Sequence, residues 1–146
     1  MCDDREFYDT TLAGNERIEE AIHLFHTHQT PELFTAVCLA IRERMVQDGH
    51  LIFPVDTFED EEGCQCFDFK TLDLDIGPVL VAFTNMEEKK KGPPSGALSQ
   101  FIDCVLEPLT QMDGIQGLLI NPWGESLFLG KEDIGMILTP GSERFI

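Results

Sequence analysis

Residues 114–138 have the sequence GIQGLLINPWGESLFLGKEDIGMIL, and the local signals for the fold are strongest in this stretch. Residues 118–120 form an apolar run of strand length, and residues 127–129 form a second one. Between these runs, residues 121–124 predict a tight turn, because proline fixes φ at the second position and glycine closes the turn. The residues after Gly130 predict a closing helix, because apolar side chains recur there at helical spacing.

Two helices are predicted on the N-terminal side of this stretch, over residues 15–48. Asn15 is a favourable N-cap for the first helix, and apolar residues follow it at helical spacing. Thr30 and Pro31 give a second start signal, a capping hydroxyl followed by proline at the first helical position. A short link between two helices predicts an antiparallel helical hairpin. Residues 1–14 lack periodicity and are expected to form a flexible lead-in.

Three strands are predicted next, over residues 51–55, 66–76 and 79–84, with an acidic loop at 56–63. Pro54 has no N–H to donate, so we expect it at a sheet edge or at the end of its strand. Residues 79–84 are apolar almost throughout. This pattern indicates a strand that is buried on both faces and lies in the centre of the sheet.

A further helix is predicted over residues 98–109. Its apolar positions recur at helical spacing and are Leu98, Phe101, Ile102, Val105 and Leu109. The order of elements indicates an α/β (α+β) fold, with a mixed sheet of about five strands covered by helices and preceded by the helical hairpin. We expect a single domain over residues 15–146, with the hairpin at 15–48 and the sheet core at 50–139.

The chain is strongly acidic, with 27 acidic and 10 basic residues among 146 and a formal net charge of −17. Such a charge disfavours nucleic acid and anionic membranes, since both are bound through lysine and arginine. It favours a protein partner with a basic surface. The N-terminus lacks the features of a signal peptide, and no apolar run has the length that crosses a bilayer. We therefore expect a cytoplasmic protein, present as a monomer or a homodimer.

Five cysteines are present, an odd number at irregular spacing, which is typical of reduced thiols in a cytoplasm. Cys38 and Cys104 are predicted to fill the core as small apolar side chains. Cys64 and Cys66 form a C-x-C pair, but zinc sites usually show a C-x₂₋₄-C pair and a second pair downstream, and none follows. We interpret this pair as incidental.

Several short sequences after Leu51 follow one another in a recognisable order. A buried strand ends in Phe83-Thr84-Asn85, and the sequence GLLINP follows later at residues 117–122. This order resembles the SseB protein N-terminal domain family, a group of small bacterial cytoplasmic α/β domains. The resemblance does not cover the helical hairpin. It implies the α/β fold, but it implies no assigned biochemical role and supplies no catalytic residue.

Three histidines, His23, His26 and His28, form an H-x-x-H-x-H pattern near the end of the first predicted helix. Imidazole groups on one helix face suit zinc or nickel, although histidines at a helix end are more often solvated and complement the helix dipole. Asp73 and Asp75 share one strand face, which is the spacing of any solvated strand. No nucleophile, nucleotide or phosphate motif is present, so we expect neither an enzyme nor a cofactor.

Trp123 is the only tryptophan, and the predicted turn places it at the surface. Tryptophan is enriched at the centres of protein interfaces, although an indole folded over Pro122 is the alternative. We expect a non-catalytic protein-interaction domain, with Trp123, Asn121 and Pro122 as interaction candidates. The alternative hypothesis is a small-ligand or metal-binding domain that uses the histidine cluster.

Overall fold

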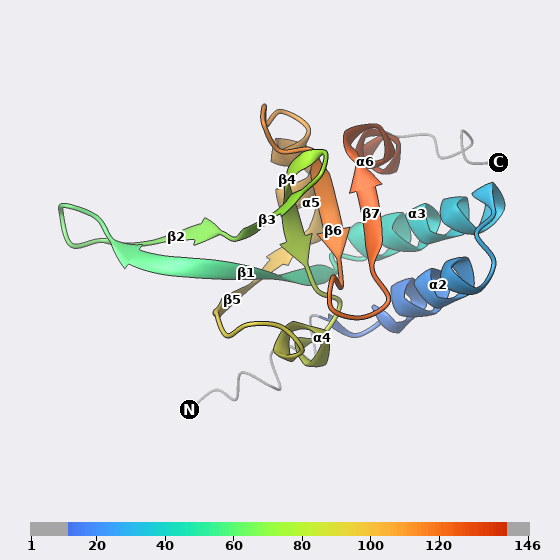
Figure 1. Ribbon diagram of the computed structural model, residues 1–146, viewed down its shortest axis with the longest axis horizontal. Helices are drawn as coiled ribbons and strands as arrows, with labels where there is room; N and C mark the ends of the chain where they lie inside the picture. The colour runs from blue at the N-terminus through green and yellow to red at the C-terminus, as the bar shows by residue number, and fades with distance from the viewer. Residues whose placement is uncertain (1–11, 140–146) are drawn as a thin grey trace.

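The computed structural model describes residues 12–139, in which helices α2–α6 and strands β1–β7 form an α+β fold (Figure 1). The predicted helical hairpin is confirmed: α2 spans Glu16–Thr27, α3 spans Pro31–Val46, and the two lie side by side. Thr30 caps α3 as predicted, because its hydroxyl accepts a hydrogen bond from the Leu33 N–H at 3.2 Å.

The strands form two sheets among the described residues, rather than the single sheet of about five strands that was predicted. The three-stranded sheet has the order β2-β1-β5, with bounds Gln65–Phe69, His50–Glu59 and Gly96–Phe101. The four-stranded sheet has the order β3-β4-β6-β7, with bounds Thr71–Leu74, Gly77–Ala82, Gly117–Ile120 and Leu127–Gly130. An antiparallel bridge between Ile52 and Phe83 joins the two sheets through hydrogen bonds of 2.9 and 2.8 Å.

The segment predicted as one helix over residues 98–109 contains two elements, and that prediction is wrong for its first part. Strand β5 ends at Phe101, and helix α5 spans only Ile102–Leu109. Leu98 lies opposite Phe53 of β1 in the antiparallel register. Residues 96–101 therefore pair with the open edge of β1, although the local spacing of their apolar residues suits a helix. Pairing with a strand that is distant in the sequence outweighs this local preference.

The four-stranded sheet has its main core on one face. Helices α2, α3 and α5, together with α6 (Lys131–Leu138), contribute buried residues to this core. Strand β4 lies between β3 and β6, and its last four residues are buried, which confirms its predicted central position. It runs parallel to β6, so the carboxyl ends of these two strands meet at the same edge of the sheet.

A second, smaller core lies on the opposite face and contains Leu12, Ile52, Val81 and Phe83. Leu12 falls within the predicted lead-in but is buried here, whereas residues 1–11 lie outside the described part of the chain. The predicted connection between β4 and the next element contains a short helix, α4, at Met86–Lys90. In Figure 1 this helix lies just beyond the carboxyl end of β4, and its residue Met86 packs against the second core.

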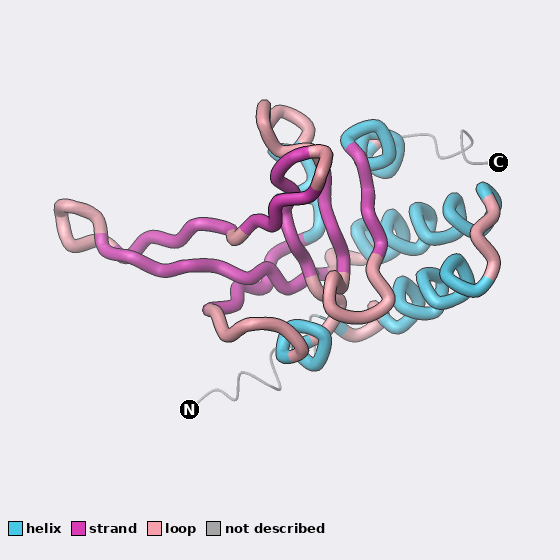
Figure 2. Tube along the Cα trace, viewed as in Figure 1, coloured by secondary structure: helices cyan, strands magenta, loops and turns pink. Residues whose placement is uncertain are grey.

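Strand β1 extends well beyond the body of the protein and forms a two-stranded hairpin with β2 (Figure 2). Its first half, residues 50–55, is buried, and its second half, residues 56–59, is exposed. The acidic segment predicted as a loop from residue 56 is therefore strand up to Glu59. We call residues 56–68 the arm. The prediction for Pro54 is wrong, because it lies inside β1, the middle strand of its sheet. It pairs with Ala97 of β5, and its carbonyl accepts from the Lys70 N–H at 2.9 Å.

Candidate functional site

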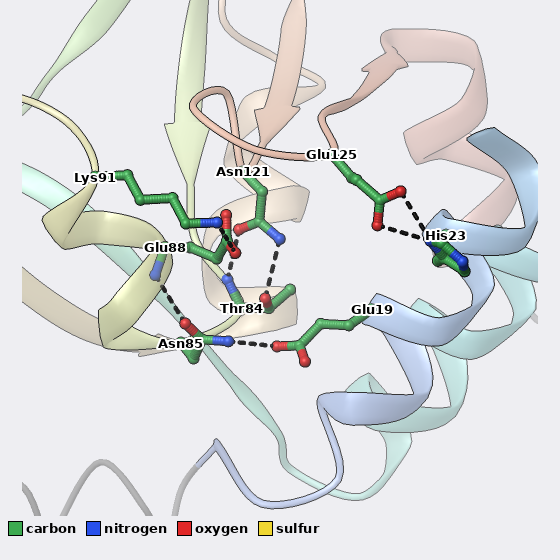
Figure 3. A network of polar contacts seen from close by, with 8 residues as sticks. All are labelled: Glu19, His23, Thr84, Asn85, Glu88, Lys91, Asn121 and Glu125. Carbon is green, nitrogen blue, oxygen red and sulfur yellow. Dashed lines mark hydrogen bonds and ion pairs between the residues drawn. The ribbon is translucent and has the colours of Figure 1, made fainter. Parts of the chain in front are cut away.

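The carboxyl ends of β4 and β6 are held together by two hydrogen bonds between Thr84 and Asn121 (Figure 3). The Asn121 side-chain amide donates to the Thr84 hydroxyl at 3.0 Å, and the Thr84 N–H donates to the Asn121 amide oxygen at 3.0 Å. Asn121 has a φ of 52°, a left-handed conformation that asparagine tolerates better than most residues. It is only 5% exposed, so its side chain serves the fold.

The predicted turn over residues 121–124 is confirmed, because the Gly124 N–H donates to the Asn121 carbonyl at 3.1 Å. Helix α4 lies against this turn and is capped by Asn85, whose amide oxygen accepts from the Glu88 N–H at 2.8 Å. The Asn85 amide nitrogen donates to Glu19 of α2 at 2.7 Å (Figure 3). These contacts fix the turn, α4 and α2 relative to one another.

Trp123 projects from this turn and lies beside a pocket between the two sheets. Its side chain packs on Gly92, where an added Cβ atom would lie 2.0 Å from the indole nitrogen. Trp123 is 42% exposed, so one part of the indole faces the pocket region and another faces solvent. The pocket has a volume of about 110 Å³, and its lining residues are Pro54, Lys70, Thr71, Leu72, Val81, Phe83, Lys89, Pro93, Ser95 and Trp123.

The pocket is apolar apart from a few polar groups, of which two are lysines. The Lys70 ammonium forms an ion pair with Asp56 at 3.0 Å. The Lys89 ammonium donates to the Ser95 carbonyl at 2.6 Å. Within residues 12–139, no carboxylate lies within 4.0 Å of the Lys89 nitrogen. The lining therefore contains two cations and no acidic side chain.

The three histidines proposed as metal ligands contact other groups or solvent. His23 pairs with Glu125 at 2.8 Å (Figure 3). The His26 ring nitrogen donates to the Ser126 carbonyl at 2.6 Å. Both contacts tie α2 to the loop between β6 and β7, while His28 is exposed at the end of α2. Among the described residues, no group of three or more His, Cys, Asp or Glu side chains is arranged to hold a metal ion.

The cysteine predictions have different outcomes. Cys38 is buried as predicted, and burial, with a smaller contribution from Asp133, raises the pKa of its thiol to about 12. Cys104 is exposed, so its prediction as core filler is wrong. The buried face of α5 includes its neighbours Val105 and Leu106 instead. Cys64 lies exposed at the end of the arm, and Cys66 follows it there.

A buried polar cluster around Asn15 was missed by the sequence analysis. The Asn15 amide donates to the carbonyls of His50 and Thr84 at 2.9 and 3.0 Å, and its oxygen accepts from Arg44 at 2.9 Å. Asn15 occupies the N-cap position of α2 but forms no capping hydrogen bond through its side chain. The amide instead joins the helical hairpin to the start of β1 and to the segment just after β4. Nothing in the local sequence distinguishes this role from an ordinary cap.

No protein-family model, curated protein or solved structure matches the chain. The resemblance to the SseB N-terminal domain family therefore stays a prediction. Within residues 12–139, no helix combines the length and the apolar character needed to cross a membrane. The arm and the pocket beside Trp123 are the two features of the described surface that we take as candidate functional sites.

Proposed function

We propose that this chain is a non-catalytic protein-interaction domain of the bacterial cytoplasm, and that its arm binds a basic protein surface. The observation that carries the proposal is the arm itself, which projects from the body (Figures 1 and 2). It exposes aromatic side chains among acidic ones. A projecting hairpin offers a large contact area to a partner, whereas the fold itself gains little from it.

A row of phenylalanines runs from the core out along one face of the arm. Phe53 is fully buried, and the Phe69 ring packs edge-to-face against it with the ring centroids 5.4 Å apart. The Phe67 ring packs in the same way against Phe69, with the centroids 5.6 Å apart. Phe67 is 46% exposed, and Phe58 on the opposite face of the arm is 45% exposed. Aromatic side chains are enriched at interface centres, and here they are held in place by the two paired strands.

The charge of the arm favours a basic partner. Residues 56–68 contain no lysine or arginine, and their acidic residues are Asp56, Glu59, Asp60, Glu61, Glu62 and Asp68. One of these carboxylates is neutralised by Lys70, which follows the arm. Acidic groups around exposed aromatic rings steer a cationic surface toward the contact and disfavour acidic competitors.

The backbone of the arm also has open edges. β2 is an edge strand of its sheet, and the pairing of β1 with β5 ends at Val55, which leaves residues 56–59 paired on one side only. A partner strand could pair with such an edge through main-chain hydrogen bonds, as in β-strand addition. Trp123 stays an interaction candidate in the body of the protein.

A catalytic role has less support. The pocket beside Trp123 is not lined by His50, Asp73 or Asp75, side chains that could act as an acid or a base. The Lys70 ammonium is paired with Asp56, and the lining contains no histidine, cysteine or carboxylate that could act as a general base. We therefore retain the non-catalytic hypothesis.

The test begins with native mass spectrometry of the untagged chain, purified gently from its own cells, to identify a bound polypeptide. The dissociation constant of the purified pair is then measured by calorimetry at two salt concentrations. We expect Phe67→Ser to weaken binding at least tenfold, about 1.4 kcal/mol, and added salt to weaken it further. Phe101→Ser is the matched control, since Phe101 is similarly exposed but lies outside the arm.

Two results would contradict the proposal. One is a partner whose affinity for the Phe67→Ser variant equals its affinity for the unmodified chain. The other is a native mass spectrum in which the purified chain gives a strong signal and carries no bound polypeptide. Circular dichroism melting of each variant separates a lost contact from a lost fold, because Phe67 contributes little to the core.

A further inference from the structure

We infer that the pocket beside Trp123 binds a small molecule with an apolar body and one carboxylate, and that the carboxylate faces Lys89. This inference is independent of the arm, because the lining of the pocket includes no residue of the arm. It also differs from the histidine-based ligand hypothesis, since none of the three histidines lines this pocket.

The walls of the pocket suit an apolar group of about ring size. The apolar lining of the pocket consists of Leu72 of β3, Val81 of β4 and Phe83 just after β4, together with Pro54, Pro93 and Trp123. The volume of about 110 Å³ is comparable with the cavity of about 150 Å³ that accepts benzene in another protein. A nucleotide or an oligosaccharide would need more room and more polar partners.

The pocket is formed before any ligand arrives. Phe83 is held by its two backbone hydrogen bonds to Ile52, and the indole of Trp123 is held against Gly92. The turn that carries Trp123 is itself fixed by the buried Asn121. A site with rigid walls binds a matching ligand with a smaller loss of conformational entropy than a site that must be assembled.

Lys89 supplies the charge that selects a carboxylate. Its ammonium is half-buried and uses one donor on the Ser95 carbonyl, so two of its three N–H donors have no partner within residues 12–139. Lys70 also lines the pocket, but Asp56 neutralises it. The lining therefore keeps the positive charge of Lys89 and contains no acidic side chain, so it is complementary to a ligand with one anionic group.

The probe for this inference is 3-phenylpropanoate, compared with the neutral 3-phenylpropanamide. Trp123 is the only tryptophan of the chain, so indole fluorescence reports on this pocket alone. We expect the carboxylate to change the fluorescence saturably and to bind at least tenfold more tightly than the amide. Lys89→Met should abolish this preference, because the apolar stem remains and the charge is lost.

Lys90→Met is the matched control, because Lys90 is the next residue of α4 and does not line the pocket. Its affinity for both probes should equal that of the unmodified chain. A second variant, Leu72→Trp, fills the pocket without removing a charge and should abolish the binding of both probes. Because it adds a second indole, its binding is measured by calorimetry instead of fluorescence. Thermal melting of each variant shows whether the fold is retained.

Three results would overturn the inference: no saturable change with 3-phenylpropanoate, equal affinity for the acid and the amide, or an unchanged preference in Lys89→Met. Selective binding of a peptide with a C-terminal phenylalanine, without binding of 3-phenylpropanoate, would also overturn it and would assign the pocket to a protein terminus. None of these results bears on the arm, so the two proposals fail separately.

Discussion

The two halves of strand β1 have the same backbone conformation and opposite surroundings. Residues 50–55 pair with β5, and all six are buried. Ile52 also bridges to Phe83 just after β4, and side chains of this half pack in the core beneath the helices. Residues 56–59 pair only with β2, and all four are exposed. Hydrogen-bonded pairing therefore does not bury a strand by itself. The second layer packed on the sheet decides burial, and the arm has no such layer among the described residues.

The largest effect expected from this comparison concerns the two ends of the phenylalanine row. Phe53→Ala should lower the free energy of unfolding by about 3–5 kcal/mol, because it leaves a cavity in the main core. Phe67→Ala should lower it by about 1 kcal/mol or less, since the ring is half-exposed and contacts chiefly Phe69. Urea denaturation followed by circular dichroism gives both values.

Equal losses for the two substitutions would break the comparison, because they would show that the arm is packed in solution. Phe53→Leu serves as a milder variant where Phe53→Ala fails to fold. Its smaller cavity should keep the loss measurable while it stays larger than that of Phe67→Ala.

A smaller effect is expected for polar side chains in the two regions. Asn121→Ala should lower the free energy of unfolding by about 2–4 kcal/mol, because it leaves the Thr84 N–H buried without a partner and places alanine at positive φ. Gln65 is the matched carboxamide of the arm, where it bonds Glu59 at 3.0 Å in an exposed position. Gln65→Ala should change stability by no more than about 0.5 kcal/mol.

Chemical denaturation of these two variants measures the difference. An Asn121→Ala variant as stable as the unmodified chain would show that the strand ends do not need the side chain. In that case Asn121 would become available again as a contact residue for a partner.

The smallest effect expected is a pH dependence from His50, which lies at the buried end of β1. Burial, and secondarily the charge of Arg44, lowers the pKa of His50 from its ordinary value of 6.5, while Asp48 opposes the shift. The unfolded chain therefore takes up the proton at a higher pH than the folded one. The stabilisation is fully present above pH 6.5 and is lost as the pH falls from there through the folded-state pKa.

Melting temperatures at neutral and mildly acidic pH test this sign. The unmodified chain should lose more stability on acidification than His50→Gln, which retains a group able to bond Ser99. His28→Gln is the control, because His28 is exposed at the end of α2. A His50→Gln variant with the same pH dependence as the unmodified chain would contradict the prediction.

The fold could be predicted best where its signals are local. The two strands, the turn and the helix of residues 114–138 depend on nearby proline, glycine and apolar spacing, and all four are present in the structure. Strand β5 could not be predicted in the same way, because it is defined by the distant edge of β1. Leu98 satisfies the helical spacing and the strand pairing equally, and the tertiary contact decides between them.

The candidate sites show the same division. The sequence indicated an exposed Trp123, because a short turn projects its side chains, but the pocket beside it is lined by segments from β1 to the β6–β7 loop. No local pattern brings Pro54 and Lys89 together. The acidic composition of the arm can be read from the sequence. Its structure as two paired strands cannot, because it depends on the register between β1 and β2. The aromatic row follows from that register.

The strands of the two sheets are interleaved along the chain. β1 and β2 belong to one sheet, β3 and β4 to the other, β5 returns to the first, and β6 and β7 complete the second. No single break between β1 and β6 would leave both sheets whole. The consequence is folding cooperativity. If one sheet unfolds, the strands of the other sheet lose the chain connections and packing that hold them in place, so we expect the body to unfold in one all-or-none transition.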